Sequence, residues 1–336
     1  MNLIKQKMIN YIIVDTANMF FRAKHVVRGD SLDTKIGMCW HIMFSSINKA
    51  WKQFHGNHVV FCLEGRSWRR SVYDPYKRNR DAVRDALTPK EQEEDEVFWN
   101  AFIEFQTFLK EKTNCTVLQD GQCEADDFIA QWIFNHPKDR HVIVSSDSDF
   151  YQLISDNVRQ YNGIMKHIIT IDGYYDDSNK ELIDKKTGEH RKLAEPEWLL
   201  FEKCMRGDTS DNIFSAYPGV RKKGSKNKVG LIEAFADRHN KGFDWNNLML
   251  QRWVDHEGNE HRVLEDYERN RMLVDLTQQP DEIKLALNET IDTVVNKEPV
   301  QNVGLHFMRF CGVWDLQRIS TSVPEHAEYL NAKYVN

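Results

Sequence analysis

The sequence predicts an α/β fold in which helices flank a mostly parallel central sheet, followed by a smaller helical C-terminal domain. Two observations support this prediction. The first half of the chain alternates short apolar runs, rich in β-branched residues, with longer segments of helical periodicity. After about Leu193 the strand signal fades and helical runs dominate. The 336 residues fit about two domains of ordinary size.

Four short apolar runs in the first half are expected to form buried strands, because each is short and rich in β-branched side chains. They cover residues 11–14, 59–63, 116–118 and 142–144. A helix is predicted before the third run, where apolar side chains between Val97 and Leu109 fall on one stripe. The later helical runs cover residues 198–205, 229–236, 265–276 and 281–287.

Two polar stretches interrupt this pattern. Residues 66–96 are highly charged, and residues 173–191 are polar and rich in turn-forming residues. We place the domain boundary at the second stretch, which gives a first domain of residues 1–192 and a second of residues 193–336. The acidic run at residues 91–96 is interpreted as a solvated face or as the start of the next helix.

The charge and the cysteines argue against several classes of protein. The formal net charge is −6 and the pI is near 6.1. A purely electrostatic binder of nucleic acid would be basic, although the distribution of charge matters more than its sum. The six cysteines form no Cys-x-x-Cys pair, so we expect free thiols and no zinc site. The N-terminus lacks a signal-peptide pattern, and no apolar run reaches the roughly 18 residues of a membrane span. We therefore expect a cytoplasmic protein with no membrane partner.

Carboxylates stand at the ends of the predicted strands. Asp15 ends the first strand, Glu64 ends the second, and Asp147 follows the fourth. Because ligands of open α/β sheets bind beyond the carboxyl ends of the strands, these acids are expected at one edge. The remaining acids follow Asp147, begin a predicted helix or lie between two helices, and they are Asp149, Glu124, Asp126, Asp127, Asp208 and Asp211.

Nine converging carboxylates would repel one another strongly. Two unit charges about 4 Å apart cost several kcal/mol even at an effective dielectric constant near 20. Oxygen-only ligands favour Mg²⁺, with Mn²⁺ as a substitute, and two such ions are a known arrangement for hydrolysing phosphodiesters. Any one of these acids alone is more often a turn or helix-cap residue. It is their joint arrangement that predicts a shared metal site.

A basic and aromatic tract follows Glu64. Residues 66–84 contain seven basic and two acidic residues, with aromatic side chains interleaved. Basic side chains neutralise phosphates, and aromatic rings stack on unpaired bases. A solvated charged helix is the alternative interpretation.

A second basic segment, residues 218–228, contains five basic residues and no acid. Its glycines would let backbone N–H groups approach a phosphate closely, and an apolar helix follows it. A flexible basic surface loop is the alternative interpretation.

Taken together, these motifs resemble the 5′-nuclease/flap endonuclease family, and among its members most resemble phage enzymes of the T-even RNase H type. The resemblance covers about residues 11–240. It is carried by Ile-Val-Asp15-Thr-Ala-Asn18, Glu124-Ala-Asp126-Asp127, Ser-Ser-Asp147-Ser-Asp149-Phe and Gly-Asp208-Thr-Ser-Asp211-Asn, together with the two basic tracts. It implies a PIN-like nuclease domain with an arch at about residues 66–96. It also implies a helix–loop–helix DNA-binding element at about residues 208–240.

The resemblance also implies roles for individual residues. The first metal ion would be held by Asp15, Glu64, Glu124, Asp126 and Asp147. The second would be held by Asp127, Asp149, Asp208 and Asp211. Lys77 and Arg80 would act on the scissile phosphate. The remaining DNA contacts would be Arg69, Arg70, Tyr76, Arg221, Lys222, Lys223, Lys226 and Lys228. Glu64 departs from the family pattern, which usually has Asp at this position.

The implied activity is 5′→3′ exonuclease and flap endonuclease cleavage, including RNase H-like primer removal, with two Mg²⁺ ions. The implied partners are branched or nicked DNA and RNA–DNA hybrid, with single-strand-binding protein and other replication proteins as candidates. We expect a monomer in the cytoplasm, which is the host cytoplasm if a phage encodes the chain.

Two other functions are alternatives to this interpretation. A non-catalytic protein that binds branched DNA would result if the Glu64 departure disabled the first metal site. A different Mg²⁺ phosphohydrolase with a nucleophilic Asp would need Asp-x-Asp after the first strand, whereas Asp15 is followed by Thr16 and Ala17.

Overall fold

The structure is a computed structural model that describes residues 8–29, 31–226 and 228–335. It consists of two compact units. The first unit contains Met1–Ser67, Leu87–Leu193 and Asp281–Asn336, and the second contains Trp68–Ala86 and Ala194–Pro280. Among the described residues, no helix is both long and apolar enough to cross a membrane.

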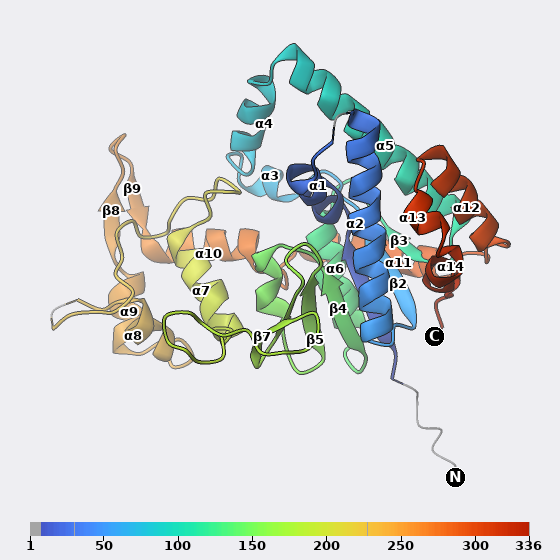
Figure 1. The fold of residues 1–336 in the computed structure, drawn as a ribbon. Helices are drawn as coiled ribbons and strands as arrows, with labels where there is room; N and C mark the ends of the chain where they lie inside the picture. The colour runs from blue at the N-terminus through green and yellow to red at the C-terminus, as the bar shows by residue number, and fades with distance from the viewer. Residues whose placement is uncertain (1–7, 30, 227, 336) are drawn as a thin grey trace, which may run out of the picture. The chain divides into compact units, whose positions relative to one another are not determined.

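The first unit is built on a seven-stranded sheet with the order β3-β2-β1-β4-β5-β6-β7 (Figure 1). The strands are β1 (Asn10–Asp15), β2 (His58–Cys62), β3 (Thr116–Leu118), β4 (Arg140–Val144), β5 (Val158–Asn162), β6 (His167–Thr170) and β7 (Gly173–Asp176). Neighbouring strands from β3 to β5 pair in parallel, and the β5–β6 and β6–β7 pairs are antiparallel. The predicted α/β class and the four predicted strands are confirmed, whereas β5, β6 and β7 were not predicted.

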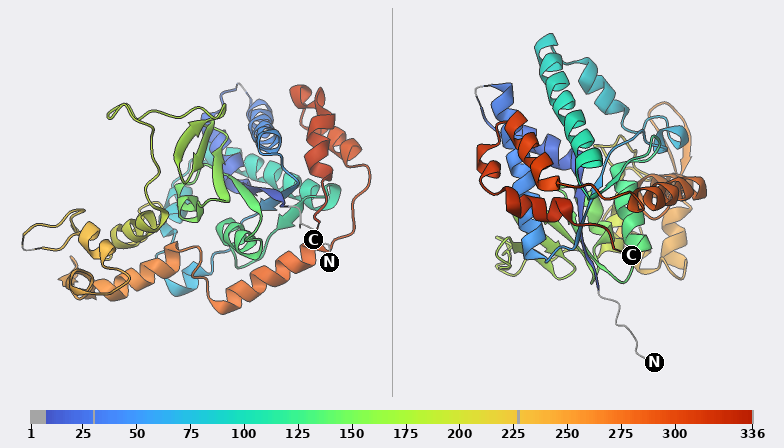
Figure 2. Two further views of the ribbon diagram at one scale, coloured as in Figure 1. Left: turned by 90° about the horizontal axis from the view of Figure 1, so that it is seen from below. Right: turned by 90° about the vertical axis from the view of Figure 1, so that its right-hand side faces the viewer.

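Helices cover both faces of this sheet. They are α1 (Thr16–Val26), α2 (Leu32–Gln53), α5 (Pro89–Lys112), α6 (Ala125–Asn135), α11 (Asp281–Val295), α12 (Val303–Val313), α13 (Gln317–Ser320) and α14 (Val323–Asn331). In the left view of Figure 2, α2 and the C-terminal helices lie on one side of the sheet, and α6 and α11 lie on the other. The strands between them are therefore buried on both faces, as their continuous apolar runs require.

The chain divides between Leu193 and Ala194, one residue from the predicted boundary, but the C-terminal segment belongs to a different unit than predicted. Asp281–Asn336 belongs to the sheet unit, because aromatic side chains of α12 pack into that unit's core. Phe307 lies 5.0 Å from Phe44, and Phe310 lies 4.6 Å from Phe108, between ring centroids. The apolar stripe of a helix near the C-terminus, such as α12, indicates that one face of the helix is buried. It does not indicate which part of the chain that face packs against.

The acidic run at residues 91–96 forms the first turns of α5. This agrees with its interpretation as the start of the next helix. Thr88 and Glu91 cap this helix reciprocally, each accepting a hydrogen bond from the backbone N–H of the other, and Pro89 occupies its first position. Farther along α5, Phe98, Phe102 and Phe105 enter the core.

The second unit is mainly helical. It contains α3 (Arg69–Val72), α4 (Arg78–Asp85), α7 (Pro196–Arg206), α8 (Leu231–Ala236), α9 (Phe243–Met249) and α10 (Val263–Val274), with a hairpin of β8 (Arg252–Val254) and β9 (Glu260–Arg262). Phe201, Leu231, Trp245 and Leu248 form part of its core. The hairpin was not predicted, because its strands have three residues each and its side chains are largely exposed.

Candidate active site

Asp15 lies at the carboxyl end of β1, where the chain turns into α1. Its side chain is 3% exposed, accepts a hydrogen bond from the Asn18 N–H at 3.3 Å, and accepts another from the Ser145 hydroxyl at 2.8 Å. Burial, followed by the negative charge of Glu64, raises the pKa of Asp15 to about 8. A carboxylate at this position therefore requires positive charge nearby to stay ionised at neutral pH.

Two more acids lie beyond the strands on either side of β1. Glu64 follows β2, is exposed, and accepts a hydrogen bond from the Ala125 N–H at 3.3 Å. Asp147 follows β4 and caps the short 3₁₀ helix η1 (Ser148–Leu153), accepting the Asp149 N–H at 3.0 Å. Both negative charges act on Asp15, and both raise its pKa. The structure thus brings acids from three adjacent parallel strands to one edge of the sheet.

A further group of acids begins α6. Glu124 is buried and accepts a hydrogen bond from the Ser67 hydroxyl at 2.8 Å. The buried carboxylate of Asp127 accepts the Glu124 N–H at 3.0 Å, so Asp127 also serves as a capping residue. Asp126 is partly exposed. After burial, the charges of Asp15, Asp126 and Glu64 hold the pKa of the Cys62 thiol well above its usual range, which links α6 to the strand-end acids.

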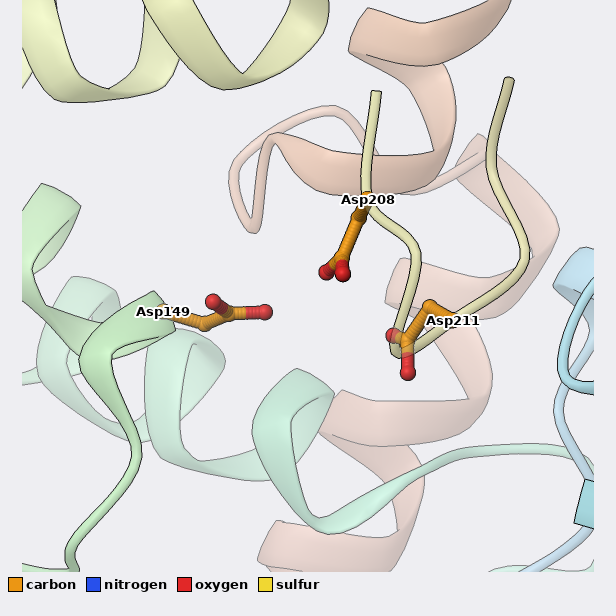
Figure 3. A group of neighbouring side chains, drawn as sticks. All are labelled: Asp149, Asp208 and Asp211. Carbon is orange, nitrogen blue, oxygen red and sulfur yellow. The ribbon is translucent and has the colours of Figure 1, made fainter. Parts of the chain in front are cut away.

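Asp208 and Asp211 belong to the second unit, on the loop that follows α7, and their carboxylate oxygens lie within 4.8 Å of one another. Figure 3 shows both side chains on this loop, and it also draws Asp149, which belongs to η1 of the first unit. Gly207, with φ of 74°, starts the loop, and a Cβ there would lie 2.3 Å from the Ile213 carbonyl oxygen. Glycine therefore allows the close backbone approach that brings the two acids together.

Both acids of this loop contact cations of their own unit. The ammonium group of Lys203 lies 2.7 Å from Asp208. Burial opposes ionisation of Asp208, but Lys203 and hydrogen bonds from Ser210 outweigh it and lower the pKa of Asp208. The guanidinium group of Arg80 lies 2.6 Å from Asp211, and the ammonium group of Lys77 lies 3.8 Å from it. The predicted catalytic cations are thus held beside a predicted metal ligand.

Two of the predicted DNA contacts are buried in the structure. The Arg69 side chain is 1% exposed and donates to the Leu273 carbonyl oxygen at 2.8 Å. The Tyr76 side chain is 3% exposed, packs in an apolar cluster, and contacts Asp211 through its hydroxyl at 3.2 Å. Neither is available to a DNA strand in this conformation, because sequence alone does not separate buried from exposed members of a mixed tract. Arg70 is exposed and pairs with Asp81 at 3.2 Å.

The second basic segment forms a loop between α7 and α8, and its basic side chains are all exposed: Arg221, Lys222, Lys223, Lys226 and Lys228. One backbone donor of this loop already has an internal partner. The Gly224 N–H donates to the Glu233 carboxylate at 2.9 Å. An acid nine residues later therefore occupies this donor.

Two residues of this unit, Lys203 and Glu233, were not predicted from the sequence. The only sequence signal for Lys203 is a basic residue on the helix just before the Asp208 loop. The only sequence signal for Glu233 is its position three residues after Gly230, the spacing at which an acid accepts the N–H group of a helix N-cap residue. Both signals are common in helical proteins, so neither points to this loop by itself.

An acid-lined edge of a parallel sheet, together with a helical unit that carries a basic loop, is an arrangement suited to binding metal and phosphate. Residues 10–187 match the family described as 5′-3′ exonuclease, N-terminal resolvase-like domain. This match covers more than half of the chain, and the chain belongs to that family.

Individual relatives agree with this assignment. The chain is 29% identical over 201 residues to a 5′-3′ exonuclease of Mycoplasmopsis pulmonis, covering 58% of each chain. It is 25% identical over 233 residues to the flap endonuclease Xni of Shewanella piezotolerans, covering 68% of this chain and 78% of that one. The chain spans a little over half the length of several curated relatives that it matches.

Solved structures share the fold over nearly the whole chain. The 5′-exonuclease of bacteriophage T5 with bound zinc ions has a TM-score of 0.57 at 19% identity, covering 95% of this chain and 99% of that one. The T5 flap endonuclease in a complex with DNA and metal ions has a TM-score of 0.52 at the same identity and coverage.

Proposed function

We propose that this protein is a structure-specific 5′ nuclease that hydrolyses phosphodiesters at the 5′ ends of nicked, flapped or RNA-primed duplexes with two Mg²⁺ ions. The observation that carries the proposal is the buried Asp15 carboxylate at the acid-lined edge of the sheet, where burial and then the charges of Glu64 and Asp147 raise its pKa to about 8. Membership of the 5′-3′ exonuclease family supports the same activity.

The donor set of the first unit fits a hard divalent cation. Asp15, Glu64, Glu124, Asp126 and Asp147 would hold the first ion, because they offer carboxylate oxygens, which Mg²⁺ prefers, with Mn²⁺ as a substitute. Bound Mg²⁺ would lower the pKa of a water molecule and stabilise the leaving oxygen. Hydrogen bonds from Ser145, Ser67 and the Ala125 N–H orient three of these carboxylates.

In the second unit, Asp208 and Asp211 are proposed to contribute to the second ion, and Lys203 keeps Asp208 ionised. The participation of Asp127 and Asp149 stays a prediction from the sequence. Lys77 and Arg80, which contact Asp211 in this structure, would also contact the scissile phosphate. There they would stabilise the negative charge that develops during cleavage.

The basic loop is proposed to bind the duplex. Its five exposed cationic side chains would contact backbone phosphates, so binding would not depend on base sequence. The T5 flap endonuclease, with which the chain shares its fold, was solved with DNA and metal ions. RNA–DNA hybrid, single-strand-binding protein and other replication proteins remain proposed partners of a monomeric enzyme.

Cleavage of a 5′-labelled flap with and without Mg²⁺ tests the proposed function. We expect short 5′ fragments only when Mg²⁺ is present, and loss of them in Asp15→Asn. Asp172→Asn, an exposed acid in a turn of the same unit, is the matched control and should cleave normally. A wild-type protein that binds the flap but leaves it uncut with Mg²⁺ or Mn²⁺ would instead be a non-catalytic DNA-binding protein. Parallel reactions on nicked and RNA-primed duplexes would then establish the preferred substrate.

A further inference from the structure

Several main-chain donors around the basic loop are used inside the protein. The chain turns back between Ser225 and Lys228, whose backbone groups exchange two hydrogen bonds of 2.8 and 3.2 Å. The first N–H groups of α8, those of Leu231 and Ile232, donate to the carbonyl oxygens of Arg221 and Lys222 at 3.0 and 2.9 Å. These donors are therefore not open to a phosphate.

Glu233 accepts two further hydrogen bonds from backbone N–H groups beside the loop. One of its carboxylate oxygens accepts the Gly224 N–H at 2.9 Å and the Gly230 N–H at 3.0 Å. The hydrogen bond from Gly224 is the largest of the effects that lower the pKa of Glu233, so the side chain is an anion at neutral pH. The loop thus surrounds a negative charge supplied by its own chain.

Both glycines are needed for this contact. A Cβ at Gly224 would lie 2.5 Å from the Lys228 carbonyl oxygen, and one at Gly230 would lie 2.4 Å from the Gly224 nitrogen. These distances are too short for any other residue without movement of the backbone. The two sides of the loop therefore approach one another closely, and the Glu233 carboxylate bridges them.

We propose that Glu233 is a positioning residue for DNA binding. Its carboxylate fixes Gly224 and Gly230, and the loop held in this way keeps its five basic side chains exposed. It follows that the N–H groups of Gly224, Ser225 and Lys228 do not contact the duplex, whereas the loop's exposed cationic side chains do. This inference rests on the proposed function, because it assumes that the exposed cations contact DNA.

Two substitutions separate geometry from charge. E233Q removes the negative charge but keeps an oxygen that can accept both N–H groups. E233D keeps the charge but is one methylene shorter, so it cannot bridge both glycines without moving the backbone. E268Q removes an exposed acid of α10 and is the matched control for charge alone.

Affinity for a nicked duplex, measured in EDTA by fluorescence anisotropy, should be about tenfold weaker in E233D and within about twofold of wild type in E233Q. A purely electrostatic role gives the reverse pattern, because removing an acid beside phosphate-binding cations would tighten binding in E233Q and leave E233D unchanged. That pattern would overturn the proposal, as would equal weakening in both variants.

Amide hydrogen exchange of Gly224 and Gly230, followed by NMR on glycine-labelled full chain, tests the contact without DNA. Both amides should exchange slowly in wild type and E233Q and at least about tenfold faster in E233D. Fast exchange in wild type would show that Glu233 does not hold the loop. Slow exchange in a wild-type protein that binds no duplex would leave the contact intact but refute the proposed function and, with it, the role in DNA binding.

Discussion

The acid-lined sheet edge of the first unit and the basic loop of the second unit place charge by opposite means. At the sheet edge, Asp15 and Glu124 are buried and held by hydrogen bonds from fixed neighbours, and burial raises the pKa of Asp15. In the loop, the cationic side chains are exposed, and hydrogen bonds hold the backbone that carries them. A preorganised site of the first kind suits a chemical step, whereas exposed charges of the second kind suit a phosphate backbone of any sequence.

This comparison predicts that substitutions at the sheet edge change turnover and that substitutions in the loop change affinity. The largest effect is expected for Asp15→Asn, which keeps the shape of the side chain but removes its charge. Cleavage of a 5′ flap should slow by a factor of about 10³ or more, as for loss of a metal ligand, while affinity for the flap stays within about twofold. Single-turnover kinetics and a binding isotherm measure the two quantities separately. A large loss of affinity with normal turnover would reverse the assignment of roles.

Lys77→Gln tests the cations that contact Asp211, and a smaller effect is expected. Removing this charge should lower the single-turnover rate by about 10²-fold, because one stabilising group for the scissile phosphate is lost. Arg84→Gln, an exposed residue of α4, the helix that begins directly after Lys77, is the matched control. If the Lys77 variant only weakens binding, Lys77 is a DNA contact and not a catalytic residue.

The loop substitutions Lys222→Ala and Lys223→Ala should together reduce affinity by about tenfold at low salt and leave turnover of bound substrate unchanged. The slope of log affinity against log salt should fall by about 1.8, because each phosphate contact contributes about 0.9. Lys185→Ala with Lys186→Ala removes two adjacent exposed charges of the first unit and serves as the control. An unchanged slope in the loop variant would exclude these side chains from the DNA footprint.

The two regions also differ in how far the sequence predicts them. The positions of Asp15, Glu64 and Asp147 follow from strand patterns, because parallel strands end at a common edge and a buried strand is visible as an apolar run. Periodicity likewise predicted α7, α8 and α10 to within a few residues. Local chemistry was enough in these cases, since each depends on a short stretch of chain.

Features that depend on distant partners were not predictable in the same way. The burial of Arg69 depends on the Leu273 carbonyl group, 204 residues away. The placement of α12 depends on Phe44 and Phe108, which lie far earlier in the chain. The bond between Glu233 and Gly224 spans only nine residues, but it requires the turn at Ser225–Lys228, which no residue pattern specified.

The smallest predicted effect concerns stability. It tests whether the buried Asp15 carboxylate destabilises the folded protein when it is ionised. The pKa of Asp15 is about 8 in the folded protein and near its ordinary value of 3.8 in the unfolded chain. Between these pH values Asp15 is protonated in the folded protein and ionised in the unfolded chain. The free energy of unfolding therefore decreases as the pH rises from about 4 to the folded pKa of about 8.

In EDTA, the melting temperature of wild type should therefore fall more steeply between pH 6.5 and 8.5 than that of Asp15→Asn, with the difference reaching about 3 °C. His58 and His141, whose pKa values burial lowers to about 4, titrate below this window in the folded state and affect both proteins equally. Added Mg²⁺ should raise the wild-type melting temperature most at the high end of the window, because it binds the ionised form. Parallel melting curves for the two proteins, with no effect of Mg²⁺, would mean that this acid is neither destabilising when ionised nor a ligand, and the contrast between the two regions would fail.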